Sequence, residues 1–179
     1  MLRTLGVLLA GVVLVAGCDS LGGGTDALSA EWLDFDPCQL GEARAAASIL
    51  GAKEINTEII DTISMFSETD EVTGRNCIFD AGGIGNSVSI WFGAGTQPMD
   101  RGGRLIDLPG IGDKAGLNIN DNPGYEGEIM GIVVNIDDMS LLVMAPVSDA
   151  PREGSAEADQ LVEMARVAAD RMRAEMAVR

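Results

Sequence analysis

The sequence predicts an α+β fold, in which an antiparallel sheet carries an N-terminal and a C-terminal helix packed on one of its faces. The expected elements run in the order helix, several strands, helix, and that order is typical of helices segregated to one face of an antiparallel sheet. Residues 87–93 alternate in the manner of a half-buried antiparallel strand, and residues 156–178 carry the apolar stripe of an amphipathic helix.

The first predicted helix begins at Asp36. Asp36 can cap it, Pro37 suits the first helical position, and Gln39 completes the spacing of a capping box. Gly51 is placed to end it. Its expected apolar face consists of Leu40, Ala43, Ala47 and Leu50.

Residues 54–66 fit both a strand and a helix. Their isoleucines satisfy a period of two and also a helical stripe, but the β-branched content favours a strand. We therefore expect a strand here, followed by a polar, acidic loop over residues 67–75.

Further strands are expected before the last helix. In the strand at 87–93, one face holds Val88, Ile90 and Phe92, and the other holds Ser87, Ser89 and Trp91. Asp137 and Asp138 separate two strongly apolar segments that predict a hairpin at the centre of the sheet. The expected strands are 77–81, 87–93, 105–108, 114–119, 128–136 and 140–146.

The C-terminal helix is expected over residues 156–178. Glu157 and Asp159 in its first turn, and Arg171 and Arg173 towards its end, suit the helix dipole. Its predicted apolar face consists of Ala158, Leu161, Val162, Ala165, Ala168, Ala169, Met172 and Met176.

The N-terminus has the layout of a secretory signal. Arg3 supplies a positive charge, residues 5–15 form an apolar run, and Ala16 and Gly17 are small residues before Cys18. The apolar run is shorter than the roughly 20 residues of a membrane span. Residues 1–17 are therefore predicted to be a signal peptide.

Residues 15–18 (VAGC) resemble the bacterial lipobox, in which an aliphatic residue and two small residues precede a cysteine. The resemblance implies cleavage between Gly17 and Cys18 and attachment of lipid (diacylglyceryl, often with a further acyl chain such as palmitate) to Cys18. Residues 18–30, which include three consecutive glycines, would then be a flexible tether, and residues 31–179 a single domain. The alternative is an ordinary signal peptide with an incidental cysteine.

Three cysteines are present. If Cys18 carries lipid, Cys38 and Cys77 remain as an even pair, and outside the cytoplasm such a pair is normally a disulfide. The alternative is a metal or redox pair, but the spacing is far from C-x-x-C and the chain has no histidine to complete a metal site.

The chain is strongly acidic, with 28 acidic and 12 basic residues and a net charge of −16. Such a surface repels phosphate backbones, so nucleic acid is not expected as a partner. It could attract cations or a basic partner, or simply keep a secreted protein soluble.

Familiar catalytic machinery is missing from the sequence. The absence of histidine excludes Ser-His-Asp and Cys-His catalysis and ordinary zinc enzymes, and Lys53 and Lys114 are the only lysines available for Ser-Lys chemistry. No enzyme activity, cofactor or metal is therefore expected. The adjacent carboxylates are expected to be solvated charges or turn residues: Asp34 with Asp36, Asp70 with Glu71, and Asp137 with Asp138.

Two loop motifs and two tryptophans have alternative interpretations. Residues 110–116 have the spacing G-x-G-x-x-x-G, which we interpret as a turn into a strand rather than a phosphate loop. Residues 118–124, with Glu126 or Glu128, could hold Ca²⁺, but an Asx-rich turn is preferred. Trp32 and Trp91 could mark an exposed ligand patch, with packing beneath a helix as the alternative.

A combination of short motifs resembles a group of small actinobacterial lipoproteins of unknown function. The motifs are the lipobox, the segment from Asp36 to Leu40 (DPCQL), the segment 77–79 (CIF) and the segment 110–115 (GIGDKA). The resemblance implies an extracytoplasmic domain with a disulfide between Cys38 and Cys77. It carries no activity over to this chain.

Three functions are compatible with these residues. The first is a lipid-anchored, non-catalytic binding or interaction module on the extracytoplasmic side of a cell membrane, whose partners are the membrane itself and an unknown envelope protein or small apolar ligand. The second is a carrier of an apolar small molecule or lipid, suggested by the aliphatic and Met-rich content. The third is a hydrolase that uses carboxylates alone.

Overall fold

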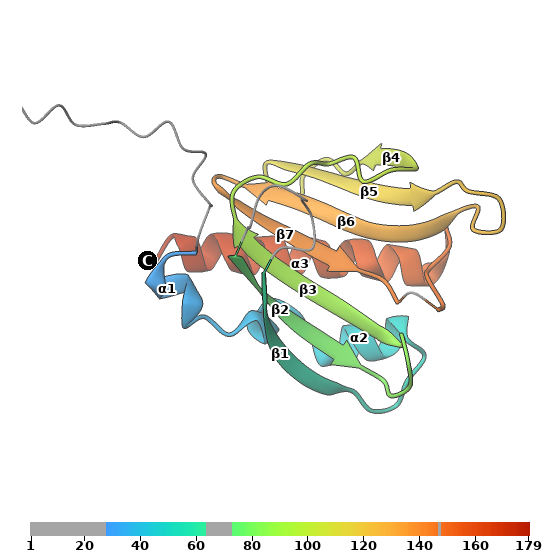
Figure 1. The fold of residues 1–179 in the computed structure, drawn as a ribbon, viewed down its shortest axis with the longest axis horizontal. Coiled ribbons are helices and arrows are strands. Elements are labelled where there is room, and N and C mark those ends of the chain that lie inside the picture. Colours follow the sequence, from blue (N-terminus) through green and yellow to red (C-terminus); the bar gives the residue numbers. More distant parts are fainter. Residues whose placement is uncertain (1–27, 64–72, 147) are drawn as a thin grey trace, which may run out of the picture.

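The computed structural model describes residues 28–63, 73–146 and 148–179. Its main element is a seven-stranded sheet with the order β1-β2-β3-β7-β6-β5-β4, in which every pair of neighbours is antiparallel (Figure 1). The antiparallel sheet of the predicted α+β class is therefore confirmed. The strands are β1 (Asn56–Ile63), β2 (Thr73–Asp80), β3 (Ser87–Ala94), β4 (Arg104–Asp107), β5 (Lys114–Asn120), β6 (Glu128–Ile136) and β7 (Met139–Met144).

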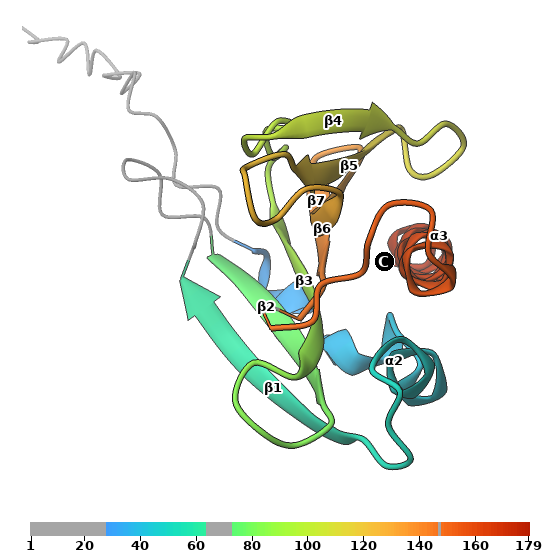
Figure 2. The same ribbon diagram turned by 90° about the vertical axis from the view of Figure 1, so that its right-hand side faces the viewer.

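Helices precede and follow the strands. They are the short α1 (Ala30–Leu33), the 3-10 helix η1 (Pro37–Gln39), α2 (Ala43–Ile49) and the long α3 (Ala156–Met176). Figure 2 shows α2 and α3 beside the same face of the sheet. α3 contacts β6, β7 and α2, and α2 contacts β2 and β3.

The main core lies between this face of the sheet and the helices. Ile90, Ile132 and Leu141 from three strands meet Leu161 and Ala165 from α3, and all five side chains are fully buried. Burial of such a layer is the dominant stabilising contribution to a fold of this kind.

The opposite face of the central strands is also buried, which corrects the prediction that β3 is half-exposed. Trp91 packs with Val133 and Leu142 and with Met99 from the β3–β4 connection. That connection is fastened to the sheet because the backbone N–H of Gln97 donates to Ser140 Oγ at 2.9 Å. The alternation of residues within one strand cannot show that a loop covers its polar face, because the loop is a separate part of the chain.

The first predicted helix is two helices. Asp36 caps η1 as predicted, accepting from the Cys38 backbone N–H at 2.8 Å, but the chain then leaves the helical path before α2. The reason is Gly41, which lies so close to the sheet that a Cβ there would be 2.6 Å from Ile90 Cδ1. Gly51, with φ +60°, follows the end of α2 as expected.

The interruption changes which face of α2 is buried. Ala46 and Ile49 are buried, whereas Ala43 is exposed and Ala47 only partly covered. Leu40 is fully buried and Leu50 packs against the core as predicted, but Ala43 and Ala47 were placed wrongly because the prediction assumed one continuous helix.

Within the ambiguous stretch at residues 54–66, residues 56–63 form a strand as expected, and the described residues 54 and 55 precede it. β1 pairs with β2 over eight residues, with Ile59 opposite Cys77. β2 begins at Thr73, so residues 73–75 belong to a strand and not to the predicted loop. The remainder of that predicted loop up to residue 72 lies outside the described residues.

The central hairpin and the last helix are confirmed. β6 and β7 pair around a tight turn in which Asp137 has φ +49°, and β7 is the middle strand of the seven. α3 begins at Ser155, whose side chain accepts from the Ala158 backbone N–H. Met164 is buried in addition to the predicted face.

The folded domain begins earlier than predicted. Leu28, assigned to the tether, is only 5% exposed and belongs to the core, and α1 starts at Ala30. The predicted signal peptide, Cys18 and the rest of the predicted tether lie outside the described residues. Within residues 28–179, as far as the structure describes them, no helix is long and apolar enough to cross a bilayer.

Candidate functional site

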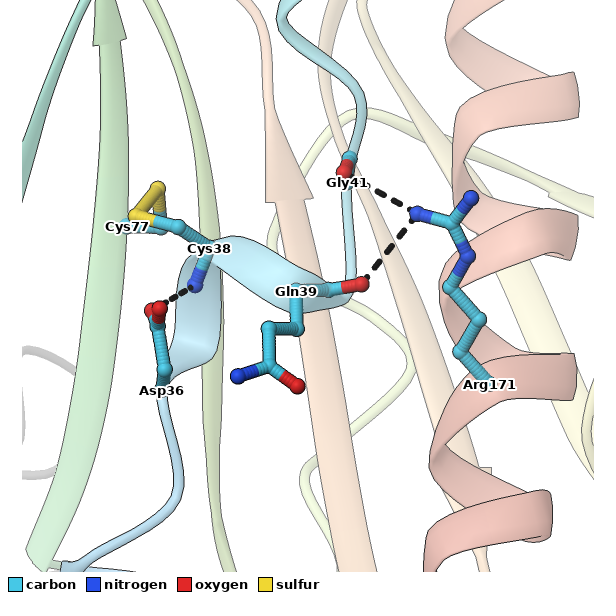
Figure 3. Close-up of a disulfide and its surroundings, with 6 residues drawn as sticks. All are labelled: Asp36, Cys38, Gln39, Gly41, Cys77 and Arg171. Atoms are coloured by element: carbon cyan, nitrogen blue, oxygen red, sulfur yellow. Dashed lines mark hydrogen bonds between the residues drawn. A yellow bond between two sulfur atoms is a disulfide. The ribbon is translucent and has the colours of Figure 1, made fainter.

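The disulfide joins η1 to β2. Cys38 and Cys77 are bonded, and their Cα atoms are 5.0 Å apart (Figure 3). Cys77 is fully buried, so the bond fastens the N-terminal segment to the interior side of the sheet. The predicted pairing is confirmed, and the bond leaves neither sulfur as a thiolate that could bind a metal.

Arg171 of α3 supports the same region. Its guanidinium donates to the carbonyl oxygens of Gln39 at 3.1 Å and Gly41 at 3.0 Å (Figure 3), and it pairs with Glu42 at 2.5 Å. These carbonyls lack helical partners because η1 ends here and α2 has not begun. The sequence suggested only a dipole effect for Arg171, since the interruption that it satisfies was not predicted.

The glycine-rich segment at residues 110–116 is structural. A Cβ on Gly112 would lie 2.4 Å from Val134 Cγ1, so only glycine fits without displacing β6. Next to it, the Asp113 carboxylate accepts from the Asp137 backbone N–H at 2.7 Å and pairs with Arg173. The Asp137 N–H, followed by Arg173, lowers the pKa of Asp113 below its usual value.

The segment at residues 118–124 forms the predicted Asx turn. Asn120 Oδ1 accepts from the Asn122 backbone N–H at 3.1 Å. The buried Asn118 is occupied elsewhere, because its Oδ1 accepts from the Arg101 backbone N–H at 3.0 Å. Across the described residues, no three acidic, cysteine or histidine side chains are grouped closely enough to hold a metal.

Neither tryptophan of the predicted ligand patch is exposed. Trp32 is 9% exposed and packs against Phe35 and Phe92, with Arg179 stacked over its ring at 4.8 Å. Trp91 is 1% exposed and lies over Gly74. Both tryptophans are therefore packed inside the domain, which is the alternative that the sequence analysis gave.

The adjacent carboxylates do not converge on a cleft where they are described. Asp36 is a helix cap, while Asp34, Asp137 and Asp138 are exposed. Asp70 and Glu71 lie outside the described residues.

An apolar groove with a volume of about 330 Å³ runs between α2 and α3. We call it the helix groove. Ala45, Met164 and Val167 form its apolar part, and Gln160 lies among them. The Gln160 Oε1 atom is buried and has no hydrogen-bond partner among the described residues. The remaining lining residues are Gly41, Glu42, Arg44, Ser48 and Glu163.

A second groove has a volume of about 330 Å³, and Ser48 lines both grooves. We call it the end groove. Asp149 and Glu157 contribute two carboxylates, and no lysine or arginine is among its described lining residues. The other lining residues are Ile49, Leu50, Gly51, Asn86 and Pro146.

Sequence reasoning missed both grooves. They exist because α2 is rotated relative to the predicted helix, which leaves Ala45 and Ser48 facing the gap between the helices. Gln160 gave no signal in the sequence, because Asp159 precedes it and Glu157 and Glu163 lie one helical turn away on either side. The pair Asp149 and Glu157 was not among the carboxylates that the sequence singled out.

Comparisons with protein-family models, with curated proteins and with solved structures find no match for this chain.

Proposed function

We propose that this protein is a lipid-anchored, extracytoplasmic lipoprotein that acts as a non-catalytic binding module of the cell envelope. The observation that carries the proposal is the disulfide between Cys38 and Cys77. Disulfides persist in oxidising compartments outside the cytoplasm. With two of the three cysteines bonded to each other, Cys18 is the one left for lipid, at the position where the lipobox resemblance places it.

Binding is favoured over catalysis by the side chains available. The chain has no histidine, and the two grooves on either side of Ser48 offer a concave surface with a few polar groups, which is the usual form of a binding site. The resemblance to actinobacterial lipoproteins points to the same compartment.

Metabolic labelling tests the anchor. Cells that express the full chain are fed an alkyne-tagged fatty acid, and the wild-type protein is expected to take up label and to fractionate with membranes. The Cys18→Ser variant should take up none. A Cys38→Ala/Cys77→Ala variant is the matched control and should still be labelled. Equal labelling of wild type and Cys18→Ser would contradict the proposal.

A carrier of an apolar small molecule is the second candidate. The helix groove favours it, because Ala45, Met164 and Val167 line it and its volume of about 330 Å³ lies at the lower end of the roughly 300–1,000 Å³ range of ligand pockets. Methionine also adapts to variable apolar ligands. Native mass spectrometry of the purified protein should detect a bound apolar molecule if this candidate is correct, and an empty protein would count against it.

A further inference from the structure

We propose that the helix groove and the end groove together bind a peptide segment of a partner protein, with an apolar side chain in the helix groove and a lysine or arginine in the end groove. This inference rests on the proposed binding function and deepens it.

The helix groove provides an unsatisfied amide. Gln160 lines the groove, and its Oε1 is buried and unpartnered among the described residues. A buried acceptor without a donor destabilises a protein, so a ligand that supplies an N–H to Gln160 Oε1 is favoured. A carboxamide carries one acceptor and two donors, and a peptide group offers the complementary donor and acceptor.

Charge defines the direction of the segment. The two glutamates that line the helix groove are each paired with an arginine, Glu42 with Arg171 and Glu163 with Arg166. Arg44 also lines this groove, so the helix groove carries no excess negative charge. In the end groove, Asp149 and Glu157 form no ion pair with any described residue. A cationic side chain is therefore attracted to the end groove, and the net charge of −16 reinforces this preference.

The position of the end groove suits a partner. Arg179, which follows α3, stacks over Trp32 of α1, so the start of the domain lies beside the C-terminal end of α3. Glu157 lies in the first turn of that 21-residue helix, about 30 Å away at 1.5 Å per residue. Figure 1 shows α1 beside the C-terminal end of α3. The end groove and the start of the domain therefore lie at opposite ends of α3.

A displayed library of random heptapeptides, selected on the full-length mature lipoprotein in detergent micelles, tests the inference. We expect an enriched family that combines an apolar residue with lysine or arginine. For a synthetic member of that family, Asp149→Asn/Glu157→Gln should raise Kd by roughly three- to tenfold at low salt, and the dependence of Kd on salt should weaken. Gln160→Ala should also raise Kd.

Matched controls separate binding from general effects. Asp159→Asn removes another first-turn carboxylate of α3 and should leave Kd unchanged, because Asp159 is exposed and lines neither groove. Gln39→Ala removes an exposed amide outside both grooves and should also leave Kd unchanged. Circular dichroism of each variant checks that the fold is retained.

Three results would overturn the inference: no enriched family, an enriched family that binds the groove variants with the wild-type Kd, or a dimer in sedimentation that the groove variants abolish. These failures are distinct from failure of the proposed function. If fatty-acid labelling does not depend on Cys18, the proposed lipid anchor is wrong, whatever the peptide experiment shows. If the protein is labelled through Cys18 but binds no peptide, the anchor stands and only the proposed peptide site is wrong.

Discussion

Asp113 connects three segments of the chain through one residue. Its carboxylate accepts from the Asp137 backbone N–H in the β6–β7 turn and pairs with Arg173 near the end of α3. Its own backbone N–H donates to the carbonyl of Asn135 in β6. Because these partners favour the ionised form, the pKa of Asp113 is lowered in the folded state.

Replacing Asp113 by Asn should therefore destabilise the protein in a pH-dependent way. A carboxylate with a lowered folded pKa stabilises above its unfolded pKa of about 4, and that contribution disappears as pH falls through the folded pKa. Asp113→Asn should have a lower free energy of unfolding than wild type at neutral pH, and the difference should shrink in acid. Denaturant titrations at several pH values measure this.

Asp107→Asn is the control for this experiment. Asp107 is an exposed residue of β4 and forms no ion pair with the described residues. Its replacement should change stability little at any pH. A pH-independent effect of Asp113→Asn would show that the side chain acts through shape and not through its charge.

Gly74 determines where the Trp91 ring can lie. A Cβ at Gly74 would be 2.2 Å from Trp91 Nε1, so the indole rests directly on the backbone of β2. Gly74→Ala should destabilise the protein by about 1–3 kcal/mol, as overpacking of a well-filled site does. Gly131→Ala is the control, because its Cβ would meet Val143 O at 3.2 Å and should perturb the sheet less. Equal losses in chemical denaturation would contradict this account.

The two longer helices depend on different parts of their surroundings. α3 carries its own start signal and a long apolar face, so it forms where the sequence places it. α2 spans only seven residues, too short to be stable without tertiary contacts, and its limits are set by Gly41 against the sheet and by the carbonyl contacts of Arg171.

Helix capping provides a test at this scale. Ser155 caps α3, with its Oγ 3.1 Å from the Ala158 backbone nitrogen, so Ser155→Ala should lower the free energy of unfolding by about 1 kcal/mol. Ser29 occupies the same position of α1 but makes no side-chain capping bond, and Ser29→Ala should have little effect. Thermal or denaturant unfolding of both variants measures the difference, and equal losses would refute the role assigned to the Ser155 hydroxyl.

At the scale of the whole molecule, the disulfide and α3 hold the N-terminal segment against the sheet. Cys38 and Cys77 are 39 residues apart in sequence, and α1 is fastened at the other end of the segment by Arg179, which donates to the Glu31 carbonyl at 2.5 Å. The N-terminal segment is thus part of one core and does not form a separate unit.

Removing the disulfide should weaken the whole fold. Closure of a loop of this length corresponds to about 4 kcal/mol in the loop-entropy model, so Cys38→Ala/Cys77→Ala should lower the free energy of unfolding by an amount of that order. Reductant should destabilise wild type and leave the double variant unchanged. A wild-type protein that is insensitive to reductant in denaturant would contradict a stabilising role for the bond.

Much of the fold could be predicted from local patterns. Four elements follow from patterns within short stretches of consecutive residues. These patterns are the alternation of β3, the β-branched content of β1, the apolar segments of the β6–β7 hairpin, and the capping residue and apolar stripe of α3. The candidate grooves could not be predicted, because they depend on how two helices far apart in the chain lie against each other.

The sequence by itself determined the element order, the central hairpin, the cysteine pair and the absence of histidine chemistry, since each follows from residue type and spacing alone. Only the tertiary structure decided that Gly41 divides the first helix, that Leu28 belongs to the core, and that Trp32 and Trp91 are covered. The physical reason is that these outcomes depend on contacts between residues distant in sequence. Gly41 lies against Ile90, Trp32 packs on Phe92, and Trp91 packs with Val133 and Leu142. Local periodicity carries no information about such contacts.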